Sequence, residues 1–210
     1  AFDSLDAVRE EKLELLRALE PGGFAVLPKG LPADLPTGVR MVRFGSAGEV
    51  VWEAGRWNDH RRTGRIDGHR CRLRLAGRHD VGNAAAAYAV LREFGISAKD
   101  AIEAMESVVP EAMRLTPRQC GRAVVWNDAY NANPESIRAA MVAFADLVEP
   151  AKPKVLVLGE VLELGHWSEH AHQELGESIA RSHAVDPFHE IFLVGDAFSL
   201  AAERLQADGF

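Results

Sequence analysis

Three polar segments carry the side chains best suited to chemistry, and each follows a short apolar run. They are residues 127–134, 159–165 and 195–196. If the apolar runs are parallel strands, their carboxyl ends meet at one edge of a sheet, where open α/β sheets bind ligands. Asp128, Tyr130 and Asn131 in the first segment have no evident structural task. Their carboxylate, phenol and amide groups suit a polar ligand, with ordinary connecting turns as the alternative.

Two other residues of the first segment do have a structural explanation. Asn133 fits the cap of a helix and Pro134 fits its first position, where a missing N–H is tolerated. The second segment takes nine residues to reach Ser168, where the next helix is expected, and this is longer than most strand-to-helix connections. The extra length favours a binding role for residues 159–165, again with an ordinary turn as the alternative.

Lys12 is the unusual residue of the first expected helix. It lies four positions after Val8 and three before Leu15, so it falls on the apolar stripe of that helix. A lysine in such a place commonly extends its amine to water along the apolar surface. The alternative is a partly buried lysine whose neutral amine can do chemistry.

A fourth candidate segment, residues 77–83, precedes an alanine-rich helix that is expected to begin at Asn83. His79 lies just ahead of this helix and could stack on a planar ligand. A single histidine in a loop is more commonly an exposed side chain with no such role. The run of alanines indicates a helix that packs closely against its neighbours.

The elements that position these residues are predicted by apolar spacing and turn residues. Asp3 or Ser4 can cap the first helix, and Asp67-Gly68 is a typical hairpin turn. In the first half we expect helices at 4–19, 83–94 and 98–109, and strands at 24–27, 39–44, 49–54 and 71–75.

The second half repeats a pattern of strand followed by helix. Strands are expected at 123–126, 154–158 and 191–194, and helices from residues 134, 168 and about 198. This alternation is typical of parallel βαβ units in a doubly wound sheet. The predicted fold class is therefore α/β with a Rossmann-like second unit. Because another strand would be expected after residue 210, we also expect the architecture to be truncated at both ends.

Charge divides the chain into the same two halves. Residues 1–115 carry 17 basic and 17 acidic side chains, whereas residues 116–210 carry 7 and 14, which accounts for the net charge of −7. Two domains with these bounds are expected. A nucleic-acid-binding protein would show a net basic surface, so this class is excluded. Eight arginines lie between positions 56 and 78, but Arg70, Arg72 and Arg74 alternate with apolar residues and are expected on a solvated strand face.

Other classes are excluded by simple patterns. No run of 18 apolar residues is present, so no membrane span is expected, and no signal peptide is expected either. Cys71 and Cys120 lie 49 residues apart and are expected to be reduced thiols of a cytoplasmic protein.

Two of the segments above resemble a known family. They are Asn-Asp-Ala-Tyr-Asn-Ala-Asn-Pro-Glu-Ser at 127–136 and Leu-Gly-Glu-Val-Leu-Glu-Leu-Gly at 158–165. Both are similar to segments of the Mur ligase family, within it the group that adds D-alanyl-D-alanine, and His172 and Gly176 follow at the family's spacing. Residues 77–83, residues 113–115 and the first helix also resemble parts of the family, so the resemblance covers nearly the whole chain.

The resemblance implies a cytoplasmic, monomeric amide ligase that uses ATP and Mg²⁺. ATP would phosphorylate the terminal carboxylate of UDP-MurNAc-tripeptide, and the amine of D-Ala-D-Ala would attack the acyl phosphate. Residues 1–115 would be the later part of the central ATP-binding domain, and residues 116–210 an incomplete C-terminal ligase domain.

The resemblance also implies roles for individual residues. Lys12 falls on the position of the family's carbamylated lysine, and as a carbamate it would hold magnesium through hard anionic oxygens. Lys12 and Asp128 would thus be catalytic, and Asp128 would bind ATP together with His79, Asn83 and Arg114. The residues implied to line the dipeptide cleft are Tyr130, Asn131, Asn133, Glu163, Leu164 and Gly165.

The sequence departs from the family in several respects. It contains no Gly-rich loop ending in Gly-Lys-Ser or Gly-Lys-Thr and no counterpart of the UDP-sugar domain. Asp80 stands where asparagine is common, and Glu160 where aspartate is common. We therefore expect a piece of a ligase that is inactive by itself. The alternatives are another ligase of the Mur or folylpolyglutamate type, or a non-catalytic α/β module that binds a nucleotide.

Overall fold

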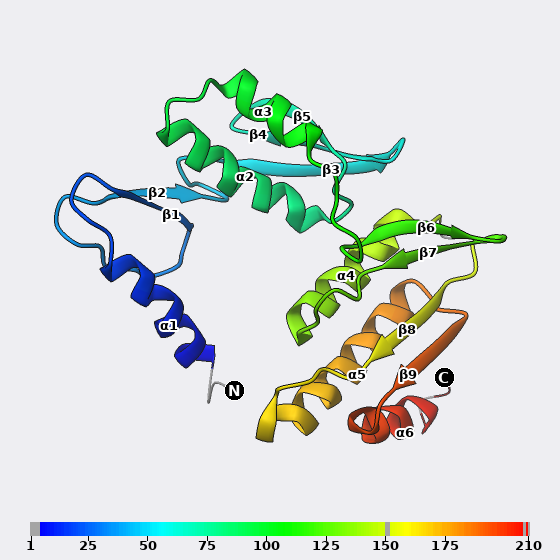
Figure 1. Ribbon diagram of the computed structural model, residues 1–210. Coiled ribbons are helices and arrows are strands. Elements are labelled where there is room, and N and C mark those ends of the chain that lie inside the picture. Colours follow the sequence, from blue (N-terminus) through cyan, green and yellow to red (C-terminus); the bar gives the residue numbers. More distant parts are fainter. Residues whose placement is uncertain (1–4, 150–151, 208, 210) are drawn as a thin grey trace. The chain divides into compact units, whose positions relative to one another are not determined.

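The computed structural model describes residues 5–149, 152–207 and 209. The chain forms two compact units, Phe2–Pro110 and Glu111–Phe210 (Figure 1). This division reflects only the contacts within each unit and assigns neither unit a function. The assignment of residues 1–115 and 116–210 to two domains of a ligase therefore stays a prediction.

The first unit contains two small sheets. Strands β1 (Phe24–Pro28) and β2 (Arg40–Phe44) pair in parallel. Strands β3 (Trp52–Asn58), β4 (Arg61–Ile66) and β5 (His69–Leu73) form an antiparallel meander.

The hairpin between β4 and β5 is as the sequence predicts. Asp67 and Gly68 have φ values of 49° and 77°, the pair of left-handed residues that a type I′ turn requires. After the turn, Cys71 and Leu73 are buried against the core. Three arginines of the same stretch are exposed on the opposite face: Arg70, Arg72 and Arg74.

Strand β4 has no counterpart among the expected strands, because arginines occupy half of it. Arg62 is fully buried, and its guanidinium donates to the carbonyl oxygens of Gly55 and Ala76, each at 3.0 Å. Buried donors need such partners, and here the backbone supplies them. Because an arginine occupies an inward position, the sequence of β4 lacks the alternation of apolar and polar residues that would have predicted a strand.

Helices α2 (Arg78–Glu93) and α3 (Ala98–Ser107) pack on the meander. A Cβ at Gly82 would come within 2.9 Å of Trp52, so the close approach of α2 to β3 depends on this glycine. The expected start of α2 at Asn83 is wrong. The helix begins at Arg78, because the Asp80 carboxylate accepts the N–H of Gly77 at 2.8 Å and caps it there.

Helix α1 (Leu5–Arg17) lacks the buried stripe that the sequence predicts. None of the side chains from residues 6–17 is buried, and Leu15 is 71% exposed. Asp6 and Arg9 form an exposed ion pair at 3.0 Å. The expected caps, Asp3 and Ser4, lie outside the described residues.

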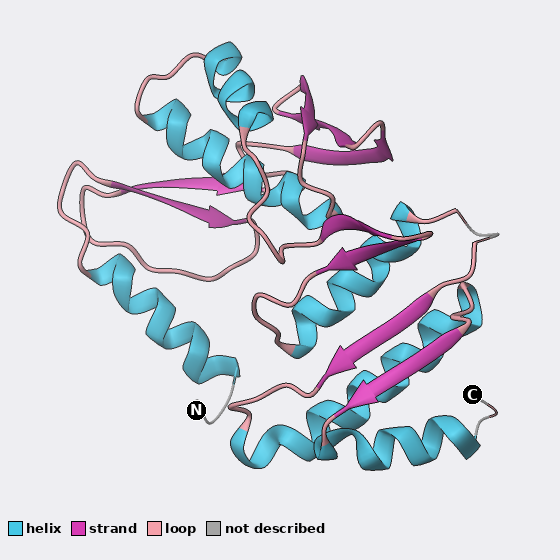
Figure 2. Ribbon diagram, turned by 45° about the vertical axis from the view of Figure 1, so that its right-hand side comes forward, coloured by secondary structure: helices cyan, strands magenta, loops and turns pink. Residues whose placement is uncertain are grey.

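The second unit alternates strands and helices (Figure 2). Strands β6 (Thr116–Cys120) and β7 (Ala123–Asn127) form an antiparallel hairpin, whereas β8 (Val155–Gly159) and β9 (Glu190–Val194) pair in parallel. The helices after β7, β8 and β9 are α4 (Pro134–Leu147), α5 (Ser168–Val185) and α6 (Ser199–Ala207). The parallel β8–α5–β9 unit is as predicted. Among the described residues β7 pairs only with β6, so the parallel sheet is smaller than predicted.

Helix α5 forms the centre of this unit's core. Its Leu175 and Ile179 are fully buried, and the inward residues of β8 and β9 pack on the same cluster. A Cβ at Gly176 would come within 2.8 Å of the Ala201 Cβ, so this glycine allows α6 to pack closely on α5. The 3₁₀ segments η1 (Gly165–Trp167) and η2 (Asp196–Phe198) precede α5 and α6.

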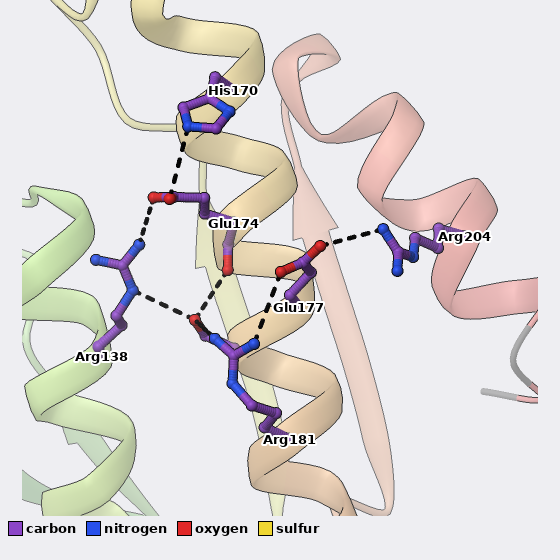
Figure 3. Close-up of polar contacts among 7 residues, drawn as sticks. Arg138, His170, Glu174, Glu177, Arg181 and Arg204 are labelled. Atoms are coloured by element: carbon purple, nitrogen blue, oxygen red, sulfur yellow. Dashed lines mark hydrogen bonds and ion pairs between the residues drawn. The ribbon is translucent and has the colours of Figure 1, made fainter.

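Ion pairs on the surface also join these helices (Figure 3). Arg138 of α4 binds Glu174 of α5 at 3.0 Å, and Arg204 of α6 binds Glu177 of α5 at 3.2 Å. Exposed pairs of this kind contribute about 0.2–1 kcal/mol each, so the alignment of the helices depends mainly on the apolar core. In the part of the chain that the structure describes, no helix has both the length and the apolar character needed to cross a membrane.

The two cysteines are expected to react with thiol reagents at very different rates. Cys120 is exposed, whereas burial and the nearby Glu106 carboxylate raise the pKa of the buried Cys71 to about 11. Because only the thiolate is nucleophilic, Cys71 should react about 100-fold more slowly than Cys120 near pH 8. Titration with a chromogenic disulfide should therefore detect one rapidly reacting thiol in the folded chain and two in the chain unfolded by urea. Two fast thiols in the folded chain, or a fast thiol in Cys120→Ser, would contradict this.

Candidate active site

The segment that precedes β6 and the segment that follows β7 contact each other at the open end of the β6–β7 hairpin. The Asp128 carboxylate accepts the N–H of Leu115 at 2.8 Å, and the N–H of Tyr130 donates to the carbonyl oxygen of Met113 at 3.2 Å. The first residue of β6 pairs with the last of β7, which brings the flanking segments together. We call this group the hairpin-end cluster; its members are Met113, Arg114, Leu115, Asp128 and Tyr130.

Arg114 and Tyr130 form a stacked pair on the surface of the hairpin-end cluster. The guanidinium carbon of Arg114 lies 4.1 Å from the centre of the Tyr130 ring, a distance at which a cation is attracted to the negative face of the ring. Tyr130 is 59% exposed, and Arg114 is exposed as well. The pair thus offers a positive, planar surface, and an arginine of this kind suits phosphate or carboxylate oxygens.

The backbone of the hairpin-end cluster is strained. Met113 and Leu115 have φ values of 61° and 46°, in the left-handed region that residues other than glycine rarely adopt. Such strain persists where the surroundings hold it, and it is concentrated at functional sites. The Asp128 bond to Leu115 supplies such a hold.

Asn133 has the structural role that the sequence predicts. Its side chain accepts the N–H of Ser136 at 2.8 Å, and its own N–H donates to Ser136 Oγ at 3.0 Å, which caps α4. Asn131 is exposed, and its side-chain oxygen accepts the N–H of Ala132 at 2.9 Å. The substrate-binding roles of Asn131 and Asn133 stay predictions.

The β8–α5 loop, residues 160–167, is tied at its start to the end of β9. The N–H of Glu160 donates to the carbonyl oxygen of Val194 at 2.8 Å, and its carboxylate accepts the N–H of Ala197 at 3.2 Å. The Glu160 side chain lies directly over Gly195, where a Cβ would come within 2.5 Å of its carboxyl carbon. Glu160 therefore links the two loops at this edge of the parallel sheet.

The predicted dipeptide residues of the second loop are not equivalent. Glu163 is exposed with a φ of 63°, and Gly165 has a φ of 55° at the start of η1. Leu164 packs partly against the apolar core of the unit. Of the three, Glu163 has the side chain most accessible to a ligand.

His79 and Asn83 share one exposed face of α2. They lie four residues apart, a spacing that places both side chains on the same side of a helix. His79 lies within the first turn of α2, so its predicted place in a loop is wrong. Its Nε2 is 3.6 Å from the Asp80 carboxylate, which is engaged in capping the helix.

Lys12 is exposed on α1, so the alternative of a partly buried lysine is wrong. Within the described ranges, no group of three or more His, Cys, Asp or Glu side chains could hold a metal ion. Mg²⁺ in nucleotide sites is commonly held by one or two carboxylates together with phosphates, and the magnesium-binding carbamate implied at Lys12 stays a prediction.

Comparison with known proteins identifies the family. Residues 113–208 match the family described as Mur ligase, glutamate ligase domain. The UDP-N-acetylmuramoyl-tripeptide–D-alanyl-D-alanine ligase of Mycobacterium bovis is 32% identical over 198 residues, which are 86% of this chain and 38% of that protein. The chain belongs to the Mur ligase family.

Solved structures of Mur ligases agree with this assignment. MurF from Acinetobacter baumannii matches with a TM-score of 0.83 and 29% identity over 96% of this chain and 45% of that one. MurF from Thermotoga maritima, solved in complex with ADP, shares the fold with a TM-score of 0.74 and 21% identity over 97% of this chain and 51% of that one. The chain spans about half or less of these relatives. The predicted α/β class and family resemblance are confirmed.

Two structural residues of this Mur ligase segment were not singled out as site residues by sequence reasoning. Glu160 ties the β8–α5 loop to the end of β9, and His172 holds the next residue of the same loop. A signal for His172 does exist in the sequence. It lies three residues before Leu175 and seven before Ile179, so it shares the buried stripe of α5.

Proposed function

We propose that this chain serves in an ATP-dependent amide ligase that joins D-Ala-D-Ala to UDP-MurNAc-tripeptide through an acyl phosphate. The proposal depends mainly on one observation, the convergence of Arg114, Asp128 and Tyr130 in the hairpin-end cluster of a chain similar to MurF proteins. A reaction on these precursors takes place in the cytoplasm, and we propose a monomer.

The nucleotide is the first ligand of this proposal. Arg114 presents an exposed guanidinium that suits phosphate oxygens, and the Asp128 carboxylate can accept hydrogen bonds from ribose hydroxyls. His79 and Asn83, on one face of α2, would contact the adenine. The MurF of Thermotoga maritima was solved with ADP, which supports a nucleotide as ligand of this fold.

The dipeptide is the second ligand. Glu163 projects from the β8–α5 loop, and its carboxylate would attract the ammonium group of D-Ala-D-Ala. The other residues proposed to line this site are Tyr130, Asn131, Asn133, Leu164 and Gly165. Lys12, as a carbamate, would hold Mg²⁺, which when bound neutralises phosphate charge during acyl transfer.

The choice of amine tests the proposed reaction. In a full-length ligase that carries these residues, D-Ala-D-Ala should be used with a kcat/KM about 100-fold or more above that of L-Ala, D-Glu or L-Glu, because a site built for one polar substrate leaves buried groups unpaired with another. Phosphate release with each amine in turn measures this preference. A preference for glutamate would indicate a different ligase of the superfamily.

The isolated chain provides the matching control. Because its 210 residues include no Gly-Lys-Ser or Gly-Lys-Thr loop, it should release no ADP from ATP and Mg²⁺. Magnesium-dependent ADP release by the purified chain would contradict the expectation that this chain is inactive by itself.

A further inference from the structure

A single buried ring holds the β8–α5 loop at Val161. The N–H of Val161 donates to His172 Nε2 at 3.0 Å, and His172 Nδ1 lies 2.6 Å from the carbonyl oxygen of Ser168. A donor at Nε2 and a carbonyl at Nδ1 together place the ring proton on Nδ1, so His172 is neutral. The ring has no exposed surface, and Val161 is 4% exposed.

The surroundings of His172 fix its ring plane as well as its hydrogen bonds. Phe198 of η2 packs against the ring edge to face, with centroids 4.7 Å apart and planes at 90°. Ser168, whose carbonyl oxygen accepts the hydrogen bond from Nδ1, is the first residue of α5. His172 therefore connects the loop, the start of α5 and the segment after β9 through one side chain.

The part of the loop beyond Val161 lacks comparable anchors. Leu162 is 71% exposed, and Glu163 is exposed with a φ of 63°. Within the described residues, the Glu163 side chain makes no hydrogen bond or ion pair. The direction in which Glu163 points is therefore set by the backbone, which is held before it by the buried hydrogen bond at Val161 and after it only by the partial packing of Leu164 on the apolar core.

We propose that His172 is a positioning residue: through the bond from Val161 to Nε2 it fixes the conformation in which Glu163, Leu164 and Gly165 are presented to the ligand. An apolar core residue of similar size would fill the same space, but it would leave the buried N–H of Val161 without an acceptor. The identity of the ligand as D-Ala-D-Ala rests on the proposed function, whereas the hold on the loop does not.

Two conservative variants separate positioning from packing. In His172→Gln the side-chain oxygen can reach the place of Nε2 and still accept from Val161. In His172→Asn the side-chain amide can take the place of Nδ1 and still donate to Ser168, but it is too short to reach Val161. Each variant keeps one of the two hydrogen bonds, so a purely structural role would make the two equally damaging.

Amide hydrogen exchange of residues 161–165 in the purified chain provides the measurement. We expect His172→Asn to accelerate exchange there by about tenfold or more, since a buried donor loses its partner, and His172→Gln to stay within about threefold of the parent. Buried amides of α4 report whether either variant is globally unfolded. Equal acceleration in both variants, or none in His172→Asn, would overturn the proposal.

The unmodified chain gives a second reading that needs no variant. Nitrogen-15 spectra should show a protonated Nδ1 and an acceptor-type Nε2, with a scalar coupling across the hydrogen bond between the Val161 nitrogen and Nε2. A protonated Nε2 or a missing coupling would refute the hydrogen bond from Val161 to His172.

Titration with D-Ala-D-Ala separates this inference from the proposed function. Shifts at residues 163–165 in the parent and in His172→Gln, with at least tenfold weaker binding in His172→Asn, would support both. If the exchange pattern is as expected but the parent chain does not respond to D-Ala-D-Ala, the dipeptide assignment fails and the positioning role stands.

Discussion

Replacing Lys12 with alanine is expected to abolish most turnover of a full-length ligase that carries this sequence, by about 10²–10³-fold in kcat. The physical reason is the loss of a hard anionic ligand for Mg²⁺ when no carbamate can form. The structure allows this loss of turnover to be distinguished from unfolding. Lys12 is exposed, and alanine is the best helix former, so α1 should stay folded and the loss cannot be attributed to unfolding.

Three controls distinguish a carbamate from a simple positive charge. Lys12→Arg keeps the charge but does not form the carbamate, so it should be as inactive as Lys12→Ala. Small carboxylic acids added to Lys12→Ala should restore part of the turnover, because they replace the missing anionic oxygen. Lys99, an exposed lysine of α3 paired with Glu103 at 3.8 Å, provides the matched site, and Lys99→Ala should retain normal kinetics. Full activity of Lys12→Ala would make Lys12 an ordinary surface residue.

Local signals predicted the parts of the fold that depend on near neighbours in the sequence. The Asp67-Gly68 turn and the cap at Asn133 each involve a few consecutive residues, so their chemistry is visible in the sequence. The β8–α5–β9 unit was predicted for a similar reason, because two apolar runs flank a periodic helix. The site segments followed directly, since they lie where these strands end.

Features that depend on distant partners were missed or mistaken. The strand β4 is concealed by Arg62, whose partners lie on β3 and after β5. The strand β6 reads as a polar segment, and only its pairing with β7 reveals it. The apolar stripe of α1 predicted burial from periodicity alone, but the structure leaves Leu15 exposed.

The candidate site shows the same division. Arg114, Asp128 and Tyr130 were each identified from their segments, but the contacts between them depend on the β6–β7 hairpin, which the sequence did not indicate. Asp128 therefore has a task that sequence reasoning did not assign. It holds the strained backbone at Leu115 in addition to any contact with the nucleotide.

This double task makes Asp128→Ala the second variant with a large expected effect. In a full-length ligase we expect the KM for ATP to rise by about 10–100-fold, because hydrogen bonds to a charged group are lost at the ribose and the N–H of Leu115 loses its acceptor. The KM for D-Ala-D-Ala should rise less than the KM for ATP, because the proposed dipeptide residues of the β8–α5 loop are anchored separately, through Glu160 and His172, and only Tyr130 of the proposed dipeptide site belongs to the hairpin-end cluster. Initial rates at varied ATP and varied dipeptide measure both quantities.

Asp128→Asn then separates the two tasks. Its side-chain oxygen can still accept from Leu115, so amide exchange at Leu115 should match the parent, while the lost charge still weakens nucleotide binding. In Asp128→Ala, exchange at Leu115 should accelerate as well. If Asp128→Ala loosens Leu115 but leaves the ATP dependence unchanged, the carboxylate only supports the backbone. In that event the nucleotide role belongs to Arg114, and its guanidinium would be the group of the hairpin-end cluster that contacts the nucleotide.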